Sequence, residues 1–338
     1  MTVPSTNLDP GDASGWAITD PVVQLRVFGS DEVFALAEGE LGAAAECAIQ
    51  LRDPAGLISR RHASLAREGD VWVLRDLASR NGVRHDGELR QTMQLGAGVE
   101  LGLGDVRLIV ESPRLVALRE LLARVIGWSR AAAVDEAVQA VRKATIWRSG
   151  LLLCGAGDLT GVARRIHDHV VGADQPFVVC AGELAVPALE RAATLCLAGK
   201  RPARDLPELA AAMRLPGRKP RTIVCAPASA DVPDVMAMLA KAAMIELPAL
   251  ATRQDELPRI IDGYAADAVT ALGAPSTGFR EHEHRWLAAT GPETLEQVEE
   301  LALRVVALRN WGVSGGSAKL GITHGALSTW ASRRKIPT

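Results

Sequence analysis

The sequence predicts a multidomain protein with an all-β sandwich first, a three-layer α/β core next and a small all-α C-terminal part. Three observations predict this. Short alternating apolar runs separated by turn residues fill the first third of the chain. The apolar period becomes helical after Pro113. The segment 301–338 holds six basic and no acidic residues. A length of 338 residues suits two or three domains.

Composition excludes several classes of protein. Lys and Arg number 38 against 40 Asp and Glu, and the net charge of −2 excludes a uniformly basic nucleic-acid coating protein. The hydrophobic share of 48% supports a folded core. An aromatic content of 4% argues against the stacked aromatic surfaces of many RNA-binding domains.

The cysteines and the N-terminal segment indicate a cytoplasmic protein. None of the five cysteines forms a C-x-x-C pair, so we expect buried, reduced thiols and no disulfide or zinc site. Residues 1–20 are rich in Pro, Gly, Asp and Ser, which predicts a flexible tail and no signal peptide. No apolar stretch is long enough to span a membrane.

The first folded region, residues 21–112, is expected to be a β-sandwich. Glycine-containing turns such as Asn81-Gly82 and Asp86-Gly87 separate its apolar runs, as in sandwich domains. The expected strands are 22–28, 32–36, 47–51, 62–66, 71–76, 99–103 and 106–110.

The second region, residues 113–275, is expected to be α/β. Residues 115–144 have helical spacing, and a second helical run covers 162–170. Buried strands are expected at 151–154, 177–180 and 222–225, and their alternation with helices favours a parallel sheet. Amphipathic helices are expected at 257–272 and 294–308, with lid-like helices in 280–308 and a separate C-terminal part at 309–338.

One ordered series of motifs lies in the β region. Ser59-x-x-His62 is followed by Asp76-Leu77-x-Ser79-x-Asn81-Gly82, which resembles the forkhead-associated (FHA) domain over about residues 22–112. The resemblance implies a sandwich that binds phosphothreonine peptides through loops at one end. By motif position, the expected phosphopeptide-binding residues are Ser59, Arg60, Ser79, Arg80 and Asn81, whereas His62 supports the loop.

One departure concerns the phosphate itself. The family's Gly-Arg pair falls at Gly42-Ala43, so the arginine that grips phosphate is absent. A charge-assisted hydrogen bond contributes about 1.5–3 kcal/mol, or about ten- to a hundredfold in affinity. Arg60, Arg80 or Arg84 could compensate. The alternative is an FHA fold that docks proteins with little or no dependence on phosphate.

A glycine-rich loop, Gly155–Gly161, lies between a predicted strand and a predicted helix. A P-loop would need a lysine there, but none occurs between Lys143 and Lys200, and Asp158 brings negative charge. A dinucleotide turn would need its last glycine one place earlier, although Glu183 could act as the ribose-binding acid. The third interpretation is a tight strand-to-helix turn.

The sequence around this loop resembles NtrC-type AAA+ activators of sigma-54 promoters over about 115–308. The similar segments are 162–167, 176–181, 189–197, 245–258 and 295–298. The Walker A lysine and the Walker B acids are missing, the loop that contacts sigma-54 is deleted, and Glu293 stands near the lid arginine position. The resemblance therefore implies an AAA-like scaffold without ATP hydrolysis, cofactor or activity at sigma-54 promoters.

The C-terminal segment 310–330 resembles the Fis-type helix-turn-helix of the same activators. Ala318 and Leu320 are expected to face the core, Gly321 to form the turn and Thr323 to cap the second helix. Ala326, Leu327 and Trp330 are expected to pack that helix back. Such motifs bind DNA as dimers, so a homodimer is expected. The expected DNA-binding residues are Thr323, His324, Gly325, Ser328, Thr329, Arg333, Arg334 and Lys335.

These patterns together indicate a cytoplasmic, DNA-binding transcriptional regulator that is not an enzyme. Its partners would be double-stranded DNA and a phosphothreonine-containing or unmodified protein. The His-x-His pairs at 167–169 and 282–284 diverge on a helix, so no metal site is expected. Two alternatives stay open: an FHA adaptor in Ser/Thr kinase signalling without DNA binding, and a nucleotide-binding enzyme that uses Gly155–Gly161.

Overall fold

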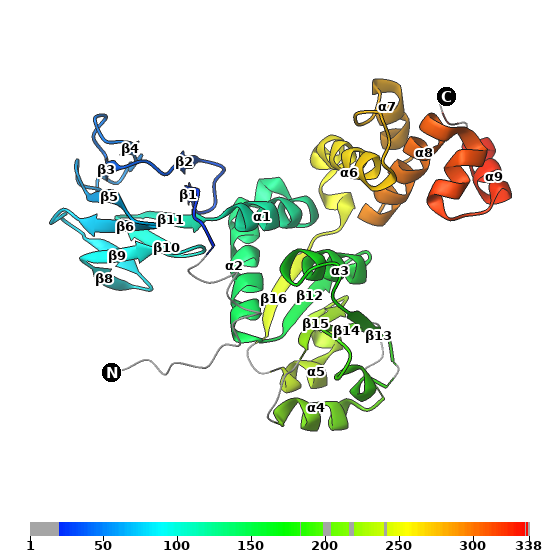
Figure 1. The fold of residues 1–338 in the computed structure, drawn as a ribbon, viewed down its shortest axis with the longest axis horizontal. Coiled ribbons are helices and arrows are strands. Elements are labelled where there is room, and N and C mark those ends of the chain that lie inside the picture. The colour runs from blue at the N-terminus through cyan, green and yellow to red at the C-terminus, as the bar shows by residue number, and fades with distance from the viewer. Residues whose placement is uncertain are drawn as a thin grey trace. The chain divides into compact units, whose positions relative to one another are not determined.

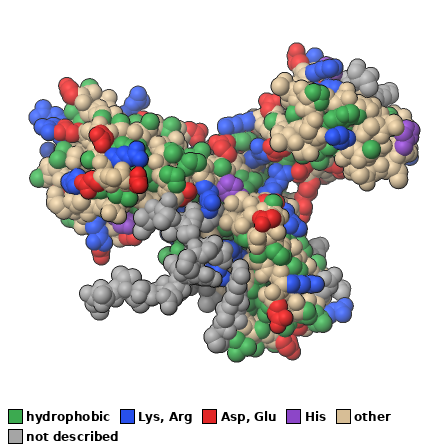
Figure 2. Space-filling view, viewed as in Figure 1, with side chains coloured by type: hydrophobic (Ala, Val, Ile, Leu, Met, Phe, Trp, Pro, Cys, Tyr) green, Lys and Arg blue, Asp and Glu red, His purple; other side chains and the backbone are tan. Residues whose placement is uncertain are grey.

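The computed structural model describes residues 20–182, 184–198, 204–215, 220–239, 242–334 and 336. The expected tail at 1–20 lies outside these residues except for Asp20. The chain divides into two compact units, residues 1–153 with 163–245, and residues 154–162 with 246–338. Within the described part, no helix is long and apolar enough to cross a membrane. Basic and acidic side chains are mixed over the face visible in Figure 2.

Two mainly antiparallel sheets, made of strands β1 to β11, form the first region (Figure 1). One sheet has the order β2-β1-β11-β10-β7-β8 and the other β4-β3-β5-β6-β9. The strands are β1 Gln24–Val27, β2 Val33–Ala35, β3 Gly39–Gly42, β4 Ile49–Gln50, β5 Ala63–Glu68, β6 Val71–Asp76, β7 Val83–His85, β8 Glu88–Arg90, β9 Thr92–Leu95, β10 Glu100–Leu103 and β11 Val106–Glu111. The expected β-sandwich is therefore confirmed.

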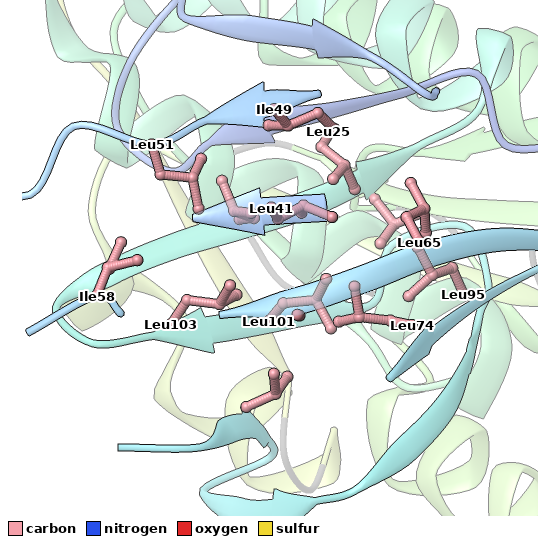
Figure 3. Packing of buried hydrophobic residues seen from close by; sticks show 14 residues of the cluster. Leu25, Leu41, Ile49, Leu51, Ile58, Leu65, Leu74, Leu95, Leu101 and Leu103 are labelled. Atoms are coloured by element: carbon pink, nitrogen blue, oxygen red, sulfur yellow. The ribbon is translucent and has the colours of Figure 1, made fainter. Parts of the chain in front are cut away.

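The sandwich core consists of aliphatic side chains that alternate along the strands and meet between the two sheets. Figure 3 shows Leu25, Leu101 and Leu103 from the first sheet facing Leu41, Leu65 and Leu74 from the second. All six are at most 1% exposed. Burial of one such side chain contributes about 1.5–3 kcal/mol to stability. This layer therefore gives the loops at the ends of the sandwich a fixed support.

A helical hairpin follows the sandwich, made of α1 (Pro113–Ile126) and α2 (Ala131–Trp147) with the short turn η2 (Trp128–Arg130) between them. The sequence predicted a helix or helices at 115–144, and the structure has two, divided at Gly127 with φ 125°. Asp135 of α2 is fully buried and lies 2.7 Å from Arg26 of β1 and 3.0 Å from Arg119 of α1. These buried ion pairs attach the hairpin to the sandwich.

The α/β region contains a five-stranded sheet of order β13-β14-β15-β12-β16. Its pairs β13–β14 and β14–β15 are parallel, as the sequence predicted. The elements are β12 Leu151–Gly155, α3 Leu159–Val170, β13 Phe177–Cys180, η3 Val186–Ala188, β14 Thr194–Ala198, α4 Leu206–Arg214, β15 Arg221–Ala226, η4 Ser229–Asp231, α5 Pro233–Met238 and β16 Ala243–Leu247.

Helices form the C-terminal part. They are η5 Leu250–Thr252, η6 Gln254–Glu256, α6 Leu257–Leu272, α7 Glu281–Ala289, α8 Leu295–Leu320 and α9 His324–Arg334. Helix α8 is interrupted at Gly312, whose φ is 63°. Arg309 of α8 donates to Glu283 of α7 at 2.6 Å, and both side chains are at least nine-tenths buried. This pair joins α7 to α8.

Candidate functional site

Two loops at one end of the sandwich are joined by three hydrogen bonds. They are the β4–β5 loop and the β6–β7 loop. The backbone N–H of Arg80 donates to Ser59 Oγ at 3.0 Å, and Asn81 Nδ2 donates to the Leu57 carbonyl at 2.7 Å. The third bond runs from the His62 ring to the Gly82 carbonyl. The structure thus brings the predicted residues of both loops together.

His62 is fully buried and supports both loops. Its Nδ1 accepts from the backbone N–H of Ser59 at 3.1 Å, so its Nε2 carries the proton that is donated to Gly82 O, also at 3.1 Å. The supporting role expected for His62 agrees with this geometry. A substitution at this position would free both loops at once.

Two acidic residues fix the shapes of the loops. The Asp53 carboxylate accepts from the backbone N–H groups of Ala55 and Ile58. The Asp76 carboxylate accepts from the Ser79 hydroxyl at 2.5 Å, and Ser79 Oγ accepts from the Gly82 N–H at 3.0 Å. Ser79, predicted to contact phosphopeptide, therefore has its hydroxyl engaged within its own loop.

Asn81 is similarly engaged. The sequence predicted that it holds the peptide backbone, and in the structure its Nδ2 holds the two loops together through Leu57. Its side-chain oxygen has no hydrogen bond with a described residue and can accept one from a peptide N–H.

Three donors on these loops, the Ser59 hydroxyl, Arg60 and Arg80, are without a partner among the described residues. Ser59 Oγ accepts the Arg80 N–H, which leaves its hydroxyl proton available to a ligand. Arg60 and Arg80 are exposed, and neither guanidinium has a hydrogen bond or ion pair with a described residue. The neighbouring Arg61 differs because it pairs with Glu40.

Ala43 lies directly beside this group. Its backbone N–H donates to the Ser59 carbonyl at 3.1 Å. A Cβ added to Gly42 would lie 2.1 Å from the Arg60 carbonyl oxygen, so the glycine of the Gly-Ala pair is required by the close approach of the backbones. The Ala43 methyl group offers no donor. Arg84 donates at 3.4 Å to Gly87 of its own hairpin, whereas the Arg60 and Arg80 guanidinium groups have no hydrogen bond with a described residue.

The Gly155–Gly161 loop has a different chemistry. Gly155 has φ 141°, and a Cβ there would lie 2.0 Å from the Leu247 carbonyl oxygen. A Cβ at Gly161 would lie 2.6 Å from Asp158 Oδ2. Gly155 is therefore required by close backbone packing, and Gly157 by its φ of 95°. The Asp158 carboxylate stands immediately before α3, where a bound phosphate would need positive charge. Glu183 lies outside the described residues.

The C-terminal turn between α8 and α9 has the local features expected of it. Gly321 has φ 64°, and Thr323 Oγ1 accepts from the Ala326 N–H at 3.2 Å, so Thr323 caps α9. Leu327 is fully buried and Trp330 is 8% exposed. A short turn thus packs α9 back onto α8.

Two details of this region were predicted wrongly. Ala318 and Ala326 were expected to pack inward, but both are exposed. Gly316 and Ser317 are buried instead. A Cβ on Gly316 would lie 3.1 Å from the Ala307 carbonyl oxygen and 3.3 Å from Leu327, so this glycine permits close packing.

The predicted DNA-binding residues lie mostly on the outer face of α9. His324, Gly325, Thr329, Arg333 and Arg334 are exposed, whereas Ser328 is half-buried. The Arg334 guanidinium lies 5.2 Å from the centroid of the Trp330 ring. Lys335 lies outside the described residues.

Comparison with known proteins identifies one part of the chain. Residues 39–104 match the family model of the FHA domain, and these residues hold both loops described above. A comparison with curated proteins found no match.

Solved structures of FHA domains are similar over about a quarter of this chain. One, from an analysis of phosphothreonine-dependent FHA domain interactions, is 32% identical, covers 27% of this chain and 95% of that chain, and has a TM-score of 0.25. The FhaA FHA domain complexed with the intracellular domain of Rv3910 is 33% identical, with coverage of 26% and 99% and a TM-score of 0.25. EmbR of Mycobacterium tuberculosis, in complex with a low affinity phosphopeptide, is 27% identical, with coverage of 27% and 24% and a TM-score of 0.25.

Proposed function

We propose that this chain, which contains an FHA domain, docks a phosphothreonine-containing protein through Ser59, Arg60 and Arg80. FHA domains bind phosphothreonine-containing partners, and the observation that carries the proposal for this chain is the group of unpaired donors on the two joined loops. A phosphate brings about −1.5 to −2 charges and three acceptor oxygens, which match one hydroxyl and two guanidinium groups.

The experiment measures calorimetric affinity of the full chain for a library of phosphothreonine peptides and for the same peptides with plain threonine. We expect binding only to phosphorylated members, and Ser59→Ala to weaken it by about tenfold. Equal affinity for both forms of the best peptide would instead show docking without dependence on phosphate and overturn the proposal.

The second proposed activity is DNA binding by α9, which would make the protein a transcriptional regulator with an FHA sensor. The support is local: the Thr323 cap, the left-handed turn at Gly321 and an exposed face with His324, Thr329 and Arg333. The α/β region would act as a scaffold without ATP hydrolysis, and homodimerisation would place two α9 helices on successive half-sites.

A salt titration of binding to sheared genomic DNA tests this activity. A DNA-binding helix of this kind should show a steep loss of affinity with rising salt, because phosphate contacts release counterions. Arg333→Ala should reduce that slope by about one. The control is Arg285→Ala, since Arg285 is equally basic and exposed but lies on α7. Absence of binding at low salt would favour the adaptor without DNA binding.

A further inference from the structure

The C-terminal helical unit contains a cavity that neither proposed activity uses. Its volume is about 440 Å³. The connection from α7 to α8 forms one wall, the first turns of α8 a second, and the last turn of α9 a third. Binding sites for small molecules commonly have volumes of about 300–1,000 Å³, so the size suits a small ligand.

Most of the cavity lining is polar, and its floor is a small apolar patch. It includes Leu301 and Trp330, each 8% exposed, and the buried Pro292. The Trp330 ring meets Trp286 edge to face with centroids 6.3 Å apart, and the Arg304 guanidinium lies 4.9 Å from its centroid. These contacts fix the indole, and the small apolar patch can pack against an apolar part of a ligand.

The rim carries unpaired groups of opposite charge. The Glu293 carboxylate and the Arg334 guanidinium both line the cavity, and neither has an ion pair with a described residue. Glu300, which also lines it, is already paired with Arg304 at 2.6 Å. Gln297 Oε1 accepts from the Glu293 N–H at 2.7 Å, which leaves the Gln297 side-chain N–H₂ free to donate.

We propose that this cavity binds a small zwitterion of the α-amino acid class with an apolar side chain. The ligand ammonium pairs with Glu293, its carboxylate accepts from Arg334 and Gln297, and its side chain lies on the floor at Trp330. A ligand of a single charge would leave either Glu293 or Arg334 without a partner. The guanidinium groups close to Trp330 also disfavour a cation against that ring.

The cavity touches the last turn of α9. Trp330 and Arg334 are one turn apart and line the cavity, whereas Thr329 and Arg333 lie on the outer face. A bound zwitterion would brace the last turn of α9. If α9 binds DNA as proposed above, the ligand acts as an effector of that binding, and this consequence alone rests on the proposed function.

The test is calorimetry of the full chain with each of the twenty L-amino acids in turn, without DNA. We expect saturable binding of at least one apolar amino acid. The matching amine without a carboxylate, and the matching acid without an amino group, should each bind at least about tenfold more weakly. Glu293→Gln and Arg334→Gln should each weaken binding by the same factor, whereas Arg285→Gln should leave it unchanged, because Arg285 is exposed and lies outside the cavity.

Two results would overturn the proposal. One is the absence of saturable heat for all twenty amino acids up to about 10 mM, a concentration that detects even millimolar affinity. The other is binding that persists in the Glu293→Gln and Arg334→Gln proteins. Because DNA is left out, failure of the DNA-binding proposal would not affect either result, and a separate DNA titration reports on that proposal.

Discussion

Two loops of this chain have sequences that suggest phosphate binding, and their structures differ. The joined loops of the FHA domain keep the Ser59 hydroxyl proton, Arg60 and Arg80 unpaired. The Gly155–Gly161 loop has Asp158 in front of α3, and local backbone requirements explain Gly155, which lies close to Leu247, and Gly157, which has φ 95°.

The difference shows that glycine spacing and phosphate affinity are separate properties. A glycine reports a backbone conformation or a close approach. Phosphate requires converging donors that remain unpaired after folding. The FHA loops have unpaired donors at Ser59, Arg60 and Arg80 although the family's arginine is missing at Ala43, whereas the Gly155–Gly161 loop has the glycines and a carboxylate.

The largest expected effect comes from removing both free cations of the FHA loops. Arg60→Ala with Arg80→Ala should weaken phosphopeptide binding by about a hundredfold, because two charge-assisted hydrogen bonds are lost. Calorimetry with one phosphothreonine peptide measures this. The matched control is Arg61→Ala, which removes an adjacent arginine already paired with Glu40 and should change affinity less than about threefold.

An equal loss in the Arg61→Ala protein would show that general positive charge, and not the two unpaired guanidinium groups, controls binding. In that case, unpaired donors would no longer distinguish the FHA loops from the Gly155–Gly161 loop.

A second prediction sharpens the contrast by adding a donor. Ala43→Arg places a guanidinium beside Ser59, since the Ala43 N–H already donates to the Ser59 carbonyl. We expect phosphopeptide affinity to rise by about tenfold. The unphosphorylated peptide serves as the control and should gain little. Unchanged affinity for the phosphopeptide would mean that Arg60 and Arg80 already satisfy the phosphate oxygens.

A third prediction concerns the pH dependence of stability that the α/β region contributes. Burial lowers the pKa of His167, whose ring bonds to Thr194 Oγ1 at 2.8 Å and to the Gln175 carbonyl at 3.0 Å. The unfolded chain therefore binds a proton more readily than the folded chain. Stability from this group is fully present above the ordinary histidine pKa of 6.5 and is lost as the pH falls below it through the lowered pKa of the folded chain.

The measurement is chemical unfolding of the wild-type protein and of His167→Gln from about pH 7.5 to about pH 5.5. The free energy of unfolding should fall more steeply with decreasing pH in the wild type. His324→Gln is the control, because His324 is exposed at the start of α9. Parallel curves for wild type and His167→Gln would contradict this account.

The sequence predicted the architecture well where side-chain periodicity is strong. Strand β6, strand β13 and helix α6 have the predicted bounds, and the sandwich and the parallel sheet are confirmed. Strand β8 was missed because all three of its residues are exposed, so it has no apolar alternation. Strand β3 was missed because two of its four residues are glycines that serve backbone approach.

The sequence predicted which residues lie at the site, but not which of their donor and acceptor groups stay free. Motif order placed Ser59 and Asn81 on loops that meet, but hydrogen-bond partners distant in sequence decide which groups stay free. Asp76 engages the Ser79 hydroxyl, and Leu57 engages Asn81 Nδ2. Similarly, the resemblance to a Fis-type helix-turn-helix placed Ala318 in the core. In the structure Gly316 packs against Ala307 instead, and Ala318 is exposed.

The smallest expected effect tests the second loop directly. Asp158→Asn removes the charge in front of α3 and should lower the free energy of unfolding by about 0.5 kcal/mol, the usual scale for a carboxylate at a helix N-terminus. It should not create affinity for ATP, because the loop still lacks a lysine to hold phosphates. Asp168→Asn, near the other end of α3, is the control and should not destabilise the protein. Micromolar ATP binding by either the wild-type or the Asp158→Asn protein would show that this loop has phosphate donors that its sequence and packing do not reveal.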